Sequence, residues 1–105
     1  MVEASASRML AAASLRAAFQ SAVEHVQSGA LAGSADSQDT KLKFYALFKA
    51  SASGTCKEKE PSSFDFVKHA KWSAWAGLGT ITRADAMREY IALVRSLDAA
   101  WNPST

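Results

Sequence analysis

The 105-residue chain has little of several features on which other proteins of its size depend. It contains one cysteine, Cys56, which excludes an internal disulfide framework and fits a reducing compartment. Isoleucine occurs twice and valine five times, and this scarcity of β-branched residues argues against a β-sheet. No apolar run approaches the roughly 20 residues that cross a bilayer, so the sequence predicts a soluble protein.

Alanine, by contrast, is abundant. The 22 alanines lift the apolar share of the sequence to 49%, but they add little packing volume, so a core must draw on the aliphatic and aromatic residues. Alanine is also the strongest helix former. A length of 105 residues suits one domain with one core. The sequence therefore predicts a single all-α domain.

The lysines are gathered in one part of the chain. All seven lie between Lys41 and Lys71, together with three acids, so this stretch has a local charge of +4. The rest of the chain, with five arginines and seven acids, carries −2. Aromatic residues accompany the lysines in Lys41–Lys49 and in Lys68–Trp75. Such a region suggests an anion that has a flat ring and an apolar tail, as in a nucleotide-bearing lipid conjugate.

Apolar spacing predicts four helices. The first runs from about Ser14 to Ser28, with Ser14 as its N-cap and Gly29 as its stop. The second begins after Ser37, which can cap it. A long link without helical periodicity follows at residues 51–64, and links of this length are often functional or mobile.

Capping residues also mark the last two helices. Asp65 can cap the third helix, which ends at Gly77 or Gly79. Thr82 begins a capping box for the fourth helix, whose apolar positions continue to Trp101. The sequence thus predicts an all-helical fold.

The first fourteen residues form an N-terminal extension to these helices. They contain one acid and many alanines and serines, which is the composition of an amphipathic transit peptide to mitochondria. The early Glu3 and the presence of only two arginines, Arg8 and Arg16, weaken this signal, so a helical or frayed extension without a targeting role is the preferred interpretation.

Five short blocks of residues stand in a fixed order along the chain: Phe44–Ala50, Asp65–Phe66, Lys71–Trp75, Asp85–Met87 and Tyr90–Ile91. Together, between about Phe19 and Trp101, they resemble the acyl-CoA-binding protein family. The resemblance implies a four-helix up-down-down-up bundle, with the binding domain at residues 15–105. It implies a carrier that binds, buffers and transports long-chain acyl-CoA esters without transforming them. Such a carrier is expected to be a cytoplasmic monomer with at most transient contacts to membranes or to enzymes that use acyl-CoA.

The resemblance also implies which residues contact the ligand. Tyr45 and Lys49 match a tyrosine and a lysine that contact the adenosine 3′-phosphate end of CoA, and Lys71 matches a lysine that reaches the same phosphate. Tyr90 matches a tyrosine that lines the ligand site, and Phe44 is assigned to the same site. Helical spacing independently places Tyr45 and Lys49 on one face. Without the resemblance, these tyrosines would be core residues and these lysines solvated by default.

The chain departs from the family's pattern at several positions. Phe48 stands where the family often has a tyrosine, so the ring remains and a hydroxyl is lost. Lys41 falls where an apolar residue, commonly methionine, helps to cover the adenine, and His69 replaces a frequent lysine. Phe48 and Lys41 are nevertheless assigned to the ligand site. Leu31 is expected to supply packing that Gly29 lacks in a first loop that is longer than usual.

Two other classes of function compete with a carrier. A thioesterase or isomerase acting on CoA esters would need a nucleophile or a base, and no Ser-His-Asp, Cys-His or paired-carboxylate arrangement stands out. A nucleic-acid-binding module would use the lysines, but a net charge of +2 and acids on the flanking helices argue against it. Zinc is not expected, because His25 and His69 lie far apart with no second ligand at metal spacing. The sequence therefore predicts a non-enzymatic carrier without cofactor or metal.

Overall fold

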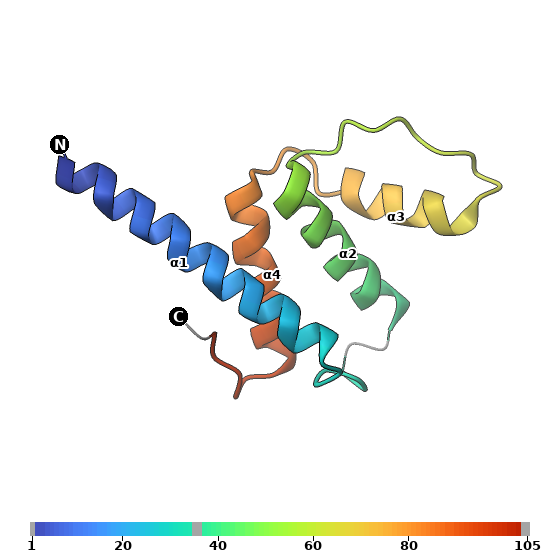
Figure 1. Ribbon diagram of the computed structural model, residues 1–105. Helices are drawn as coiled ribbons and strands as arrows, with labels where there is room; N and C mark the ends of the chain where they lie inside the picture. Colours follow the sequence, from blue (N-terminus) through green and yellow to red (C-terminus); the bar gives the residue numbers. More distant parts are fainter. Residues whose placement is uncertain (1, 35–36, 104–105) are drawn as a thin grey trace.

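The structure is a computed structural model that describes residues 2–34 and 37–103, with side chains described from residue 13 onward. Over these residues it contains four α-helices and no strand, which confirms the all-α prediction (Figure 1). The helices are α1 (Val2–Gln27), α2 (Gln38–Ser53), α3 (Phe66–Ala76) and α4 (Arg83–Leu97). Within the described residues, no helix is both long enough and apolar enough to span a membrane.

Side-chain caps begin the last three helices where the sequence predicts them. Ser37, Asp65 and Thr82 each accept a hydrogen bond from the backbone N–H three residues further on, at 3.1, 3.2 and 3.0 Å respectively. Each bond satisfies a donor that has no partner inside its helix. The three N-cap predictions are therefore confirmed.

The two ends of the helical region differ from the prediction. α1 begins at Val2, so Ser14 lies inside the helix and its assignment as N-cap is wrong. The cause is the alanine-rich sequence before Ser14, which contains no glycine or proline that would stop a helix. α4 ends at Leu97, so Trp101 lies beyond it, although its side chain still packs against the core. The side chains of residues 1–12 are outside the described part, so a targeting role for them stays a prediction.

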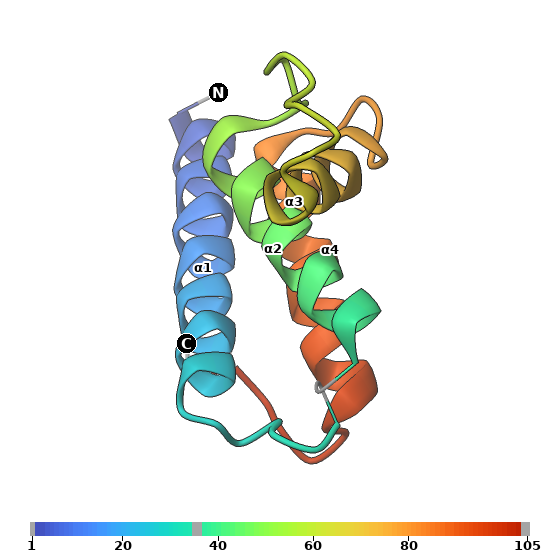
Figure 2. The same ribbon diagram turned by 90° about the vertical axis from the view of Figure 1, so that its right-hand side faces the viewer.

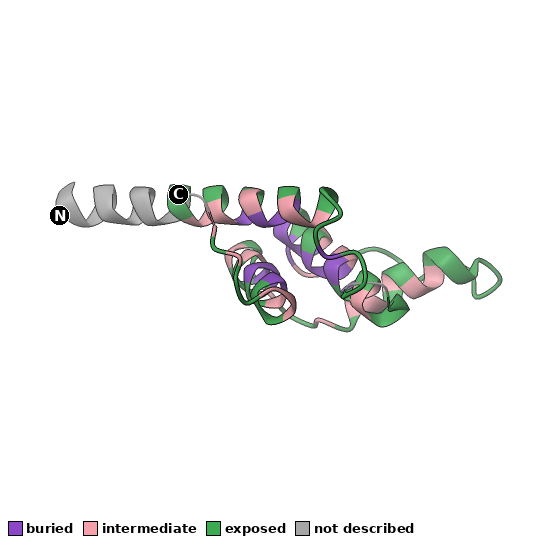
Figure 3. Ribbon diagram, turned by 90° about the horizontal axis from the view of Figure 1, so that it is seen from below, coloured by how far each residue is buried: buried purple, intermediate pink, exposed green. Residues whose placement is uncertain are grey.

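The helices pack in a chain of neighbours: α1 against α4, α4 against α2, and α2 against α3 (Figures 1 and 2). One cluster of buried side chains joins α1, α2, α4 and the first loop, and its members are Phe19, Ala22, Val23, Leu31, Phe44, Leu47, Tyr90, Ile91 and Val94. A second, smaller cluster lies where α3 meets α2 and α4, and its members are Ala46, Ala50, Trp75 and Ala86. The burial of Leu31 confirms that it packs into the core. Figure 3 shows the buried positions on the faces where the helices meet, with exposed residues around α3.

The long link between α2 and α3 is fastened at its beginning by hydrogen bonds to tryptophans. Trp75 donates from its indole N–H to the carbonyl of Gly54 at 2.9 Å, and Trp72 donates to the carbonyl of Glu58 at 2.9 Å. Gly54 has a φ of +75°, a conformation that favours glycine, and this turn ends α2. These bonds hold the first part of the link beside α3, next to the lysines.

Candidate ligand-binding site

The Tyr45 side chain is shared by two hollows. The first has a volume of about 190 Å³ and is lined by lysines and tryptophans from α3 and the preceding link; besides Tyr45 its residues are Glu58, Lys59, Pro61, Lys68, Lys71, Trp72 and Trp75. We call it the cationic hollow. The second has a volume of about 220 Å³ and lies between α1, α2 and α4; besides Tyr45 its residues are Val23, Gln27, Phe44, Phe48 and Tyr90. We call it the aromatic hollow. Tyr45 therefore links a basic surface to an aromatic one.

Lys71 and Tyr45 meet directly in the cationic hollow. The Lys71 Nζ atom lies over the Tyr45 ring, 5.3 Å from its centre, which is a cation–π geometry. The Lys71 side chain is exposed, so its charge remains available to an anion. Lys68 is held 3.9 Å from the Asp65 carboxylate, whereas Lys59 has no such pairing among the described residues. The structure thus brings together two of the residues that the sequence assigned to the phosphate, Tyr45 and Lys71.

Lys49 is held beside the cationic hollow and does not line it. Its Nζ atom lies 5.4 Å from the centre of a Trp75 ring and 4.0 Å from the Glu58 carboxylate. Trp75 itself is buried, with 3% of its surface exposed. Lys49 therefore has partners within the protein, and reaching a ligand phosphate would require it to leave Glu58.

Aromatic contacts bury Tyr90 almost completely. The side chain is 3% exposed, and its ring packs edge-on against Phe19 and Phe44, with centre-to-centre distances of 5.1 and 5.0 Å. Burial raises the pKa of Tyr90 from 10.0 to about 12, because the charged phenolate loses its hydration. Phe44 is buried as well, whereas Phe48 is 46% exposed on the same side of α2. Tyr90 and Phe44 are core residues whose edges also line the aromatic hollow.

Lys41 and His69, two positions at which the chain departs from the family's pattern, differ in their contacts with the rest of the protein. Lys41 is exposed one helical turn before Tyr45 and lines none of the hollows described above. His69 contacts the Glu60 carboxylate, with 2.8 Å between Nε2 and Oε2, and its ring is tilted against Trp72. Within the protein, its polar contact is therefore with the link.

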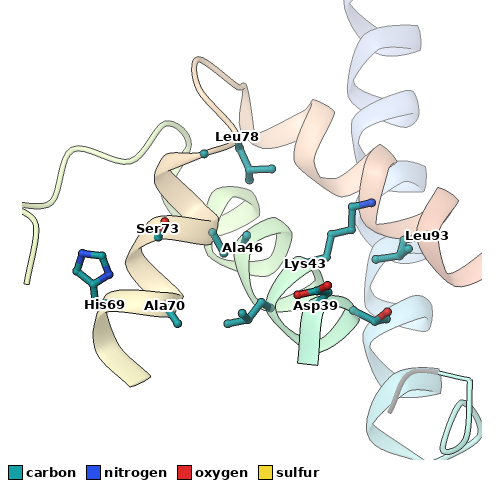
Figure 4. A pocket seen from close by; sticks show the side chains of 12 residues that line it. Asp39, Lys43, Ala46, His69, Ala70, Ser73, Leu78 and Leu93 are labelled. Carbon is teal, nitrogen blue, oxygen red and sulfur yellow. The ribbon is translucent and has the colours of Figure 1, made fainter. Parts of the chain in front are cut away.

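A third hollow, of about 690 Å³, is a trough between α2 and α3 that the sequence did not predict (Figure 4). Its apolar lining comes from both helices and from α4 with the loop before it: Leu42, Ala46, Ala70, Ala74, Leu78 and Leu93. Polar side chains also line it, among them Asp39, Lys43, His69 and Ser73. The available signal was the four-residue spacing of Leu42 with Ala46 and of Ala70 with Ala74, which gives each helix a smooth apolar stripe.

A further groove continues the aromatic hollow along α1. It has a volume of about 340 Å³ and shares Val23, Gln27 and Phe48 with that hollow. Phe19 and Phe48 face one another there, with ring centres 6.2 Å apart.

Among the described residues, no group of three or more histidine, cysteine or acidic side chains is placed to hold a metal ion.

A small helical bundle with lysines, aromatic rings and apolar hollows has the features of a ligand-binding domain. Comparison with known sequences identifies the ligand class. Residues 16–94 match the family described as Acyl CoA binding protein. The chain belongs to the acyl-CoA-binding protein family, and this membership supports acyl-CoA binding and a role as a binding protein.

Relatives agree with this assignment. The Bos taurus protein named Acyl-CoA-binding domain-containing protein 6 is 40% identical over 95 residues, which cover 90% of this chain and 33% of that protein. Its Mus musculus counterpart is 41% identical over 90 residues, covering 86% and 31%. Enoyl-CoA delta isomerase 2 from Rattus norvegicus is 40% identical over 67 residues, covering 64% and 17%. The chain thus spans about a third of the length of the first two relatives and less of the third.

Proposed function

We propose that this domain binds long-chain acyl-CoA esters without transforming them, and so buffers and transports them inside the cell. The observation that carries this proposal is the position of Tyr45, whose ring contacts the Lys71 ammonium on one side and lines the aromatic hollow on the other. A ligand with both phosphates and a flat base matches this arrangement. A cytoplasmic location and a monomeric state are parts of the same proposal.

The head group is assigned to the cationic and aromatic hollows. Lysine ammonium groups act as flexible point charges toward phosphate, so Lys71, Lys68 and Lys59 are the residues to hold the 3′-phosphate and pyrophosphate. Adenine stacks on rings as other bases do, and the exposed ring of Phe48 beside Tyr45 offers such a surface. The family often has a tyrosine at the position of Phe48, but stacking needs only the ring and not the hydroxyl.

The acyl tail is assigned to the trough between α2 and α3. A buried methylene contributes about 0.8 kcal/mol, so a long tail needs a long apolar surface. The trough is larger than the other three hollows described above, and its volume of about 690 Å³ falls in the range of ordinary ligand sites. The trough and the cationic hollow are lined by different faces of α3, with Ala70 in the first and Lys71 in the second, so a ligand that fills both must pass around that helix.

Titration calorimetry with CoA, a free fatty acid and acyl-CoA esters of increasing length tests this proposal. We expect weak binding of CoA, tighter binding of each longer ester, and little binding of the fatty acid. Absence of binding to any ester would refute it. Turnover of an acyl-CoA or enoyl-CoA that a point mutation abolishes would instead establish the alternative, a domain that processes CoA esters.

A further inference from the structure

Three large apolar side chains at the start of α3 are exposed to solvent. Phe64 is 90% exposed, Phe66 79% and Val67 65%. Phe66 and Val67 begin α3, and Phe64 lies two residues earlier in the link. A single exposed apolar residue is ordinary, but three within four positions form a patch of the kind that marks an interaction site. We call these three residues the apolar tip.

The apolar tip lies at the edge of the molecule. Figure 1 shows the start of α3 and the preceding link at the end of the structure farthest from α1. None of the three side chains lines the cationic hollow, the aromatic hollow or the trough. Their exposure is therefore not explained by the proposed acyl-CoA site.

In the segment that contains the apolar tip, the acidic side chains form ion pairs with described residues, whereas several lysines do not. Its three acidic neighbours all have partners within the protein: Glu58 with Lys49 at 4.0 Å, Glu60 with His69 at 2.8 Å, and Asp65 with Lys68 at 3.9 Å. The remaining lysines of the region, by contrast, have no carboxylate within 4.0 Å among the described residues; they are Lys57, Lys59 and Lys71. All three are exposed. Residues 57–71 thus present exposed apolar side chains and, along the same segment, ammonium groups that have no carboxylate within 4.0 Å among the described residues.

We propose that the apolar tip docks on the surface of an anionic lipid bilayer. Phe64, Phe66 and Val67 would enter the boundary between head groups and acyl chains, while Lys57 and Lys59 contact anionic head groups. Three side chains fall well short of the roughly 800 Å² that each partner buries in a stable protein complex. They suit a weak and reversible membrane contact, to which the free lysines add attraction.

Docking in this way would bring the ligand site to the membrane. Lys59, Lys68 and Lys71 line the cationic hollow, and they lie in the same segment as the apolar tip. Under the proposed function, an acyl-CoA whose tail is dissolved in the bilayer would then have a short path to the site. This consequence rests on the proposed function, but the docking itself does not.

Flotation with lipid vesicles tests the docking in the absence of acyl-CoA. We expect the wild-type chain to float with phosphatidylcholine vesicles that contain phosphatidylserine, and only weakly with pure phosphatidylcholine. The double substitution Phe64→Ser with Phe66→Ser should abolish flotation. Phe64→Ser alone, in the link and 90% exposed, should reduce it without any effect on folding. Circular dichroism monitors the folding of each variant.

Two charge-reversal variants distinguish the effect of a lysine near the tip on vesicle binding from the effect of the net charge of the protein. Lys57→Glu should weaken binding to the anionic vesicles about tenfold or more, because loss of one lysine near such a surface weakens binding about fivefold and the added negative charge roughly doubles that change in free energy. Arg95→Glu, in the last turn of α4, makes the same change in net charge far from the tip and should change binding less than about twofold.

Three results would overturn the docking proposal. One is a wild-type chain that fails to float with anionic vesicles, and another is equal weakening by Lys57→Glu and Arg95→Glu. The third is a concentration-dependent dimer that the double substitution disrupts, since this would assign the tip to a second copy of the chain. Calorimetry of the double variant with acyl-CoA in solution should give the wild-type affinity. A failure of docking is therefore distinguishable from a failure of the proposed function.

Discussion

The Lys71 ammonium lies over the Tyr45 ring, with 5.3 Å between the Nζ atom and the ring centre. The two residues belong to different helices, and the packing of α3 against α2 brings them together. The contact orients a mobile lysine without neutralising it, because an aromatic ring attracts a cation but carries no net charge. A phosphate that arrives at this surface therefore meets a charge that is already positioned.

Substitution of Lys71 by methionine should weaken the binding of CoA and of acyl-CoA by a similar factor. Both ligands share the head group, and a hydrogen bond to a charged group is worth about 1.5–3 kcal/mol, or roughly tenfold or more in affinity. Titration calorimetry with both ligands measures the two factors. Lys57→Met is the matched control, because Lys57 is exposed in the same region but lines none of the hollows. Unchanged affinity in Lys71→Met would remove this residue from the site.

A tryptophan placed in the trough should separate tail binding from head-group binding. Ser73 is exposed on α3 and lines the trough, so Ser73→Trp should fill part of it and weaken long-chain acyl-CoA by about tenfold, while CoA binding persists. Ala52→Trp provides the control at an exposed helical position that lines the groove along α1. If Ala52→Trp is the variant that loses long-chain binding, the tail lies along α1 and not in the trough.

The part of this structure that could be predicted from the sequence is the local part. Ser37, Asp65 and Thr82 cap their helices through hydrogen bonds that span three residues, so the signal and its effect lie close together in the chain. The start of α1 was not predicted correctly, because the sequence there contains no local signal that marks it. Before Ser14 no residue opposes a helix, and the apolar spacing further along does not mark where it begins.

Features that depend on how helices pack could not be predicted in this way. The partners of Lys49 are Trp75 and Glu58, which reach it only because α3 and the link fold back over α2. The trough depends likewise on the direction in which α3 leaves α2. The sequence spacing placed Lys49 on the same face of its helix as Tyr45 but did not show what covers that face. The assignment of individual residues to the ligand stays a prediction.

Alkaline pH should destabilise the protein through Tyr90. Its pKa is raised from 10.0 in the unfolded chain to about 12 in the folded one, so folding favours the neutral phenol. This contribution is fully present below pH 10 and is lost as pH rises from 10 to 12, where the unfolded state releases the proton first. Its size is about 1.4 kcal/mol for each pH unit in this window. Denaturant unfolding of the wild type and of Tyr90→Phe, at a series of pH values, measures it.

The variant Tyr90→Phe should lose less stability than the wild type across that pH window. Other groups titrate there as well, but they are common to both chains, so the difference between the two curves isolates Tyr90. Near neutral pH the substitution should be close to neutral, because among the described residues no hydrogen bond joins the Tyr90 hydroxyl to a partner. Parallel curves for the two chains up to pH 12 would contradict the raised pKa.

The last turn of α1 is tied to the end of α4 by His25, whose Nε2 atom lies 2.9 Å from the Asp98 carboxylate. The His25 ring also stacks on Trp101, with 5.5 Å between ring centres. A double-mutant cycle with His25→Phe and Asp98→Ala should give a coupling energy of about 0.5–1.5 kcal/mol in denaturant unfolding, because the pair is only partly exposed. The cycle cancels the other role of Asp98, which accepts a hydrogen bond from the backbone N–H of Ala100.

The exposed pair of Arg88 and Asp85 on α4 provides the comparison for this cycle. Its atoms approach to the same distance, 2.9 Å, but both side chains are largely in water, with 62% and 60% of their surfaces exposed. Exposed pairs one turn apart on a helix contribute roughly 0.3–0.5 kcal/mol, so the corresponding cycle should give a smaller coupling. If the two cycles agree, the contact between His25 and Asp98 adds no more than a surface pair. The attachment of α1 to α4 would then depend on their apolar packing alone.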